Sequence, residues 1–169
     1  MKFPFLLAVA ALVGLAWTGL AVARPSGLRD ERAAQADFVV NCGGCHGIEG
    51  VSNSRAVPDL KNQVGYFLNF PEGRTYLARL PNVAFSTLPD AKLADALNFM
   101  AFVLGADSVP AGARPYSAGE VGRLRKTALT GAPLRAYRDG LVERLIKDFG
   151  APDSLRLYGQ DHYGAGGGL

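Results

Sequence analysis

Residues 42–46 read Cys42-Gly43-Gly44-Cys45-His46, and the interpretation of the whole chain starts from them. The spacing is Cys-x-x-Cys-His, which is the attachment signal for c-type haem. Two thiols three positions apart can add to the two vinyl groups of one porphyrin, and the next residue can then coordinate its iron. The motif therefore predicts one covalently attached haem c, held by Cys42 and Cys45, with His46 as the proximal iron ligand.

Three other interpretations of the cysteines remain open. A thioredoxin-like redox pair would follow a strand in a βαβ unit, whereas the residues before Cys42 have helical periodicity. A zinc site commonly has four ligands from two clusters, but this chain has 2 cysteines and 2 histidines, and His162 lies far from the motif. A disulfide between Cys42 and Cys45 would close a very small loop and would leave His46 unexplained.

Residues 1–23 have the features of a secretory signal peptide. Lys2 gives a positive start, an apolar run extends from Phe3 to Leu20, and Ala21-Val22-Ala23 is a small-x-small cleavage signal. The apolar run is also nearly long enough for an uncleaved membrane anchor. We expect an exported protein that has no contact with the membrane unless this segment is retained.

The rest of the chain is predicted to be all-α. Helical patterns cover residues 28–41, 71–80, 90–104, 117–127 and 133–149, and the clearest has an apolar stripe at Leu93, Leu97, Met100 and Leu104. Pro81 is expected to end the second helix, and Gly105 is expected to cap the third. Residues 110–115 are predicted to be a linker, and the glycine-rich end to be disordered.

The residues after the haem motif resemble class I cytochromes c. Gly47-Ile48-Glu49-Gly50 is a glycine-rich loop, and Val57-Pro58-Asp59-Leu60 is similar to the family's Gly-Pro-x-Leu stretch, with valine in place of glycine. The resemblance implies a small helical domain around the haem at residues 24–109, whose last helix packs across its first. It also implies that the Pro58 carbonyl accepts the ring N–H of His46 and orients it. A helical extension at residues 110–169 has no counterpart in this pattern.

The sixth iron ligand is the point where the chain departs from the family. Class I cytochromes take a methionine from a loop before the last core helix, and Leu80 stands near that place here. Met100 is the distal candidate, although a methionine on an apolar helical stripe is also typical of a core residue. His162 in the tail is another candidate, and an open iron site is the third possibility.

The function that the resemblance implies is a periplasmic one-electron carrier, not an enzyme. It would accept electrons from an exported dehydrogenase and pass them toward the respiratory chain, to a terminal oxidase or another cytochrome. Residues 66–85 show no histidine and no obvious acid–base pair apart from Arg74, Arg79 and Glu72, which argues against a peroxidase. The alternatives are a haem-based ligand-binding or sensing module with an open distal iron, and an accessory haem subunit of a larger redox complex.

Charge is distributed unevenly along the chain. Residues 24–109 carry 8 basic and 9 acidic side chains, whereas residues 110–169 carry 9 and 6. The basic extension could steer an acidic partner weakly. No lysine-rich stripe or alternation of basic and aromatic residues is present, so nucleic-acid binding is not expected.

Overall fold

The computed structural model describes residues 26–53 and 57–159, which form helices joined by loops. No strand occurs within these described ranges, so the all-α prediction is confirmed there. None of the described helices is both long and apolar enough to cross a bilayer. The predicted signal peptide, the glycine-rich end and His162 lie outside the described residues.

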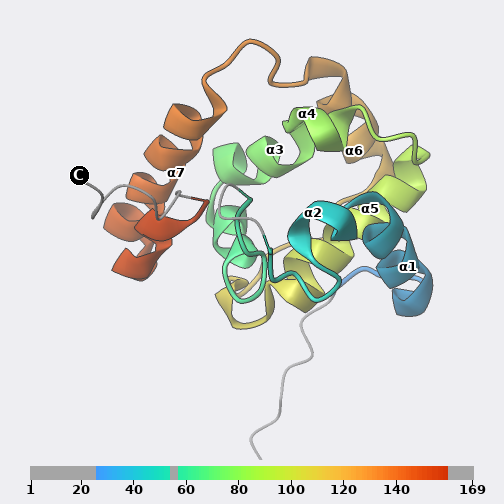
Figure 1. The fold of residues 1–169 in the computed structure, drawn as a ribbon, viewed down its shortest axis with the longest axis horizontal. Coiled ribbons are helices and arrows are strands. Elements are labelled where there is room, and N and C mark those ends of the chain that lie inside the picture. Colours follow the sequence, from blue (N-terminus) through green and yellow to red (C-terminus); the bar gives the residue numbers. More distant parts are fainter. Residues whose placement is uncertain (1–25, 54–56, 160–169) are drawn as a thin grey trace, which may run out of the picture.

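The helices of residues 26–109 are arranged around the centre of the molecule, with α3 and α4 across from α2 in Figure 1. In chain order they are α1 (Glu31–Asn41), α2 (Gly43–His46), the 3-10 helix η1 (Val64–Asn69), α3 (Pro71–Arg79), α4 (Pro81–Ala84), α5 (Asp90–Asn98), the π-helix η2 (Phe99–Leu104) and the 3-10 helix η3 (Ala106–Ser108). The extension adds α6 (Ala118–Leu124), η4 (Arg125–Thr127), α7 (Leu134–Phe149) and η5 (Asp153–Leu157).

Side chains at the helix ends explain where several helices begin. Asp30 accepts a hydrogen bond from the Ala33 backbone N–H at 3.1 Å, and Ser117 accepts one from the Glu120 N–H at 3.2 Å. Each bond satisfies a backbone donor that has no partner inside the helix. Pro81 ends α3 as predicted, but it also opens α4, because a proline at the first position of a helix loses no hydrogen bond.

Residues 90–104 were predicted to form one α-helix, but the structure divides them. The α-helical part ends at Asn98, and the next turns are π-helical as far as Leu104. Because a π-helix is wider, it interrupts the three-and-four spacing on which the predicted stripe depended. Met100 remains buried whereas Leu104 is only partly buried. Gly105 is the C-cap, with a right-handed φ of −63° and not the left-handed conformation typical of such glycines.

The first and last helices of the predicted haem domain pack against each other, as expected. The rings of Phe38 in α1 and Phe99 in η2 lie 5.5 Å apart, and both side chains are buried. Arg29, just before α1, forms an ion pair with Asp95 of α5 at 2.9 Å. These contacts fix the helix that leads into Cys42 to the core.

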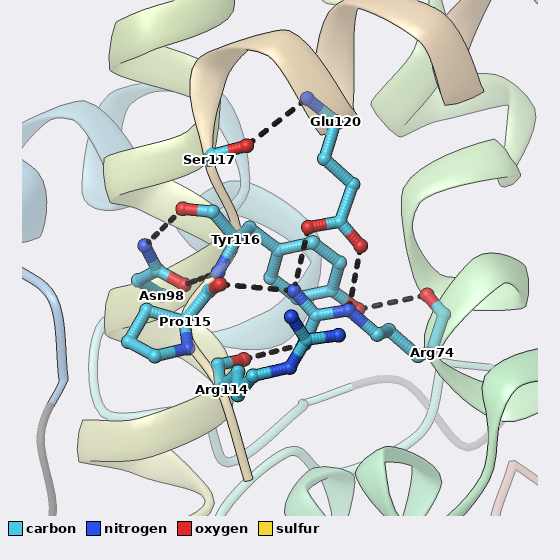
Figure 2. Close-up of polar contacts among 7 residues, drawn as sticks. All are labelled: Arg74, Asn98, Arg114, Pro115, Tyr116, Ser117 and Glu120. Carbon is cyan, nitrogen blue, oxygen red and sulfur yellow. Dashed lines mark hydrogen bonds and ion pairs between the residues drawn. The ribbon is translucent and has the colours of Figure 1, made fainter.

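Residues 110–115, predicted to be a linker, are anchored to α3 by the half-buried side chain of Arg74 (Figure 2). Its guanidinium donates to the Glu120 carboxylate at 2.6 and 2.8 Å and to the carbonyl oxygens of Arg114 and Pro115. It also lies 3.9 Å from the centre of the Tyr116 ring. Hydrogen bonding to Arg74 lowers the pKa of Glu120, so the carboxylate stays charged in this pair.

A buried asparagine holds the same segment to α5. Asn98 is 1% exposed, and its side chain accepts from the Tyr116 backbone N–H at 2.7 Å and donates to the Tyr116 carbonyl at 3.0 Å (Figure 2). The Tyr116 hydroxyl donates to the Arg74 carbonyl at 2.8 Å. Beyond this point, Val121 and Leu145 belong to the same buried cluster as Phe38. The described part of the extension therefore shares one core with the residues before it.

Replacing Asn98 with Ala is expected to lower the free energy of unfolding by about 2–4 kcal/mol, because it leaves a buried N–H and a buried carbonyl of Tyr116 without partners. Urea unfolding followed by circular dichroism measures the change. Asn41→Ala is the matched control, since the Asn41 amide bonds only one carbonyl on an exposed helix face, and its effect should stay within about 0.5 kcal/mol. Equal effects of the two variants would contradict the anchoring role of Asn98.

Candidate functional site

The Cys-x-x-Cys-His motif forms the short helix α2, directly after α1. The Cys42 N–H donates to the Phe38 carbonyl at 2.7 Å, and the His46 N–H donates to the Cys42 carbonyl at 3.0 Å. Both thiols are free; that of Cys42 is partly buried and that of Cys45 is exposed. The structure therefore does not contain the disulfide considered as an alternative, and it leaves both sulfur atoms available for covalent attachment.

The structure brings His46 and Pro58 together as the resemblance implied. His46 Nδ1 lies 3.0 Å from the Pro58 carbonyl oxygen. Because a carbonyl only accepts, this contact is a hydrogen bond when Nδ1 carries the proton, and the neutral ring then has its free lone pair on Nε2. Nε2 is consequently the nitrogen that could bind a metal.

Burial lowers the pKa of His46 below its ordinary value of 6.5, against the opposing effects of the Pro58 carbonyl and the Asp59 charge. The neutral imidazole is therefore favoured at neutral pH. Since a histidine must be neutral to coordinate a metal, the surroundings of His46 suit an iron ligand.

The loop between His46 and Pro58 is closed by backbone hydrogen bonds. The Gly50 carbonyl accepts from the N–H groups of Leu60 and Lys61 at 2.7 and 3.1 Å. Gly47 has a φ of +73°, and a Cβ there would lie 2.1 Å from the Val51 carbonyl oxygen, so the turn requires glycine. The closed loop brings Pro58 back beside the motif.

Two further residues connect this loop to the motif, and the sequence analysis did not identify them. Ser52 donates from its backbone N–H to the Asp59 carboxylate at 2.7 Å and from its hydroxyl to the Cys45 carbonyl at 3.0 Å. Asp59 thereby stabilises the loop and also adds negative charge near His46. The signal in the sequence that could have identified Asp59 is its position next to Pro58.

A small, mostly apolar cavity of about 30 Å³ lies beside Cys42. Met100 lines the same cavity, together with residues of α1, α4, α5 and the segment between α4 and α5: Phe38, Val83, Leu93, Leu97 and Leu88. Burial, and secondarily the nearby Cys45, raises the pKa of the Cys42 thiol. The structure therefore brings Cys42 and Met100 to one cavity. His46 and Pro58 are not part of its wall, and Pro58 lines a separate hollow of about 500 Å³ next to η5.

The residues present fit a covalently attached haem in their chemistry. Two free thiols have the required spacing, the next residue is a histidine with a free Nε2, and the adjoining cavity is apolar. The cavity, at about 30 Å³, is much smaller than sites for ligands of this size, which commonly measure about 300–1,000 Å³. Accommodating a porphyrin there requires the cavity wall to move outward.

Other metal chemistry has less support in the described residues. Within residues 26–53 and 57–159, no group of three or more His, Cys, Asp or Glu side chains could hold a metal ion. Leu80 lies at the junction of α3 and α4 and has no atom that coordinates iron. Met100 is thus the described side chain that brings a sulfur atom to the cavity besides Cys42.

Comparison with known proteins adds no assignment, because no family model matches this chain and no curated protein matches it. The chemistry of the site is therefore inferred from its own residues and geometry.

The lowered pKa of His46 predicts how stability depends on pH. In the haem-free chain with His162→Gln, His46 is the remaining histidine. Above about pH 7.5 the His46 ring is neutral in both the folded and the unfolded chain. As the pH falls through about 6.5, His46 binds a proton in the unfolded chain before it does so in the folded chain. The free energy of unfolding should therefore fall over this range by more than in the same chain with His46→Gln. Urea unfolding between pH 8 and pH 5.5 measures both, and equal pH dependence would contradict the lowered pKa.

Proposed function

We propose that this chain is a periplasmic c-type cytochrome that carries one electron at a time. Cys42 and Cys45 would hold the haem through thioether bonds, and His46 Nε2 would coordinate its iron. When bound, haem supplies reversible one-electron chemistry. The observation that carries the proposal is the 3.0 Å contact between His46 Nδ1 and the Pro58 carbonyl, beside two free thiols at haem-attachment spacing.

The surroundings of His46 support a role as a permanent ligand. The bond to Pro58 restricts rotation of the imidazole and increases the electron density at Nε2, which strengthens coordination. Pro58 is itself held by the closed loop, so its carbonyl does not have to be positioned when the ligand binds. A rigid ligand suits electron transfer, which proceeds fastest when the site changes little between oxidation states.

The exposure of the motif supports exchange of electrons with another protein. Cys45 is exposed, and the nearby apolar side chains of Val40 and Ile48 are 82% and 63% exposed. A group attached at Cys45 would have an edge close to the surface, where a redox partner could approach it. The proposed donor is an exported dehydrogenase, and the proposed acceptor is a terminal oxidase or another cytochrome. The periplasmic location depends on residues 1–23, which lie outside the described residues.

The distal side favours one second candidate, a module that binds a small ligand at an open iron. Leu80 replaces the expected methionine, and residues 82–88, which contribute to the cavity wall, contain neither methionine nor histidine. If Met100 remains in the core, the residues lining the cavity offer the iron no other methionine and no histidine as a sixth ligand. Such a site would bind diatomic ligands more readily than it would transfer electrons.

The visible spectrum of the reduced protein, with and without carbon monoxide, distinguishes these functions. The protein should be made in a host that attaches c-type haem. We expect sharp low-spin bands that carbon monoxide does not change, because an electron carrier has two firm axial ligands. A high-spin spectrum that shifts with carbon monoxide would contradict electron transfer and favour the ligand-binding candidate.

Met100→Leu then determines whether Met100 supplies the sixth ligand. Leucine has a similar volume, so the core should lose less than about 1.5 kcal/mol of stability. Loss of the low-spin bands in a variant that remains folded would assign Met100 to the iron. An unchanged spectrum would assign Met100 to the core, where it lies in the buried cluster.

A further inference from the structure

One wall of the cavity at Cys42 is formed by α4 and the segment that joins α4 to α5. Asn82, Val83, Ser86 and Leu88 line the cavity from this side. Asn82 and Val83 belong to α4, and residues 85–89 form no regular element. The backbone hydrogen bonds donated by this stretch run from the Phe85 N–H to the Pro81 carbonyl and from the Ser86 N–H to the Val83 carbonyl. Contacts from outside the segment therefore contribute to holding this wall in place.

Arg125, at the start of η4 in the extension, holds the segment through its backbone. Its guanidinium donates to the Ala84 carbonyl at 2.9 Å, to the Leu88 carbonyl at 2.8 Å and to the Ser86 carbonyl. It also forms an ion pair with Asp90, the first residue of α5, at 3.0 Å. One side chain therefore binds three carbonyls and one carboxylate within residues 84–90.

Other contacts of the extension reinforce this attachment on either side. The Thr127 carbonyl oxygen accepts a hydrogen bond from the Arg79 side chain, and the Leu129 N–H donates to the Arg79 carbonyl at 2.8 Å. The end of α3 is therefore also attached to the extension. At Gly122 of α6, an added Cβ would lie 2.3 Å from an Asp90 carboxylate oxygen. The extension thus fits closely against both ends of the 79–90 region.

We propose that Arg125 is a positioning residue that holds the 82–88 wall beside the Cys42 cavity, so that the C-terminal extension controls access to the haem site. The control of access rests on the proposed haem. The contacts of Arg125 with residues 84–90, which we call the clamp, are a property of the chain itself. An arginine suits this role because its planar fork presents several N–H donors in fixed directions. Carbonyl groups spread over five residues can be bound together by one such fork.

Arg125→Gln tests the proposal in the full chain, made in a host that attaches haem. Hydrogen exchange read by mass spectrometry should show faster exchange in residues 82–88 and unchanged exchange in α1. Carbon monoxide binding is measured in a Met100→Leu background, which removes the candidate sixth ligand. There Arg125→Gln should raise the binding rate of the reduced protein by about tenfold or more, the change expected when one or two net hydrogen bonds are lost. Arg125→Lys should restore part of the protection, since lysine keeps the charge but not the fork.

Arg156→Gln is the matched control. Arg156 is an exposed arginine that pairs with the side chains of Glu143 and Asp153 and contributes nothing to the cavity wall. This variant should leave both the exchange of residues 82–88 and carbon monoxide binding unchanged. If Arg125→Gln does not fold, Arg125→Lys is compared with the wild type by the same two measurements.

The failure of this proposal can be distinguished from failure of the proposed function. If the chain carries no haem, the cytochrome proposal fails, while hydrogen exchange of residues 82–88 still tests the clamp. If haem is attached but Arg125→Gln changes neither the exchange of residues 82–88 nor carbon monoxide binding, the clamp is wrong and the cytochrome proposal stands. Faster exchange throughout the chain would show that Arg125 only stabilises the fold, and would also overturn the proposal.

Discussion

The hydrogen bond between His46 Nδ1 and the Pro58 carbonyl is the constraint on which the candidate site depends. It determines which ring nitrogen is free, and burial of the same ring keeps the imidazole neutral. The loop that delivers Pro58 is closed in turn by the Gly50 carbonyl and by Ser52, which contacts the Cys45 backbone. The motif and the loop therefore form one unit, in which the position of the histidine is set before any ligand arrives.

The C-terminal extension shares the buried core of the rest of the molecule, and arginines that bind backbone carbonyls add to this attachment. Arg74 extends outward from α3 to the residues that precede α6, whereas Arg125 extends inward from the extension to the segment before α5. Within the extension itself, Arg138 of α7 donates to the Gly159 carbonyl in the same manner. Such contacts satisfy buried carbonyls in irregular segments, where no helix or sheet supplies a donor. The extension thereby stabilises the segments whose own secondary structure is weakest.

Much of the site could be predicted from the sequence because local rules govern it. The spacing of Cys42, Cys45 and His46 is read directly, and the resemblance located Pro58 and the packing of the first helix against the last. The π-helical turns from Phe99 could not be predicted, because they depend on packing rather than on a residue pattern. The contacts of Arg125 were also missed, since binding to backbone carbonyls places no requirement on which residues supply them. Residues 110–115 form no regular element, and the hydrogen bonds from Arg74 to the carbonyls of Arg114 and Pro115 were missed for the same reason.

The most direct test of the central claim is the mass of the intact protein made in a host that attaches c-type haem, measured beside a Cys42→Ala/Cys45→Ala variant. The account predicts that the wild-type polypeptide carries the added mass of one haem, that the addition maps to the peptide containing residues 42–46, and that the variant lacks it. A wild-type chain with the mass of the polypeptide alone, or with haem bound covalently elsewhere, would contradict the account.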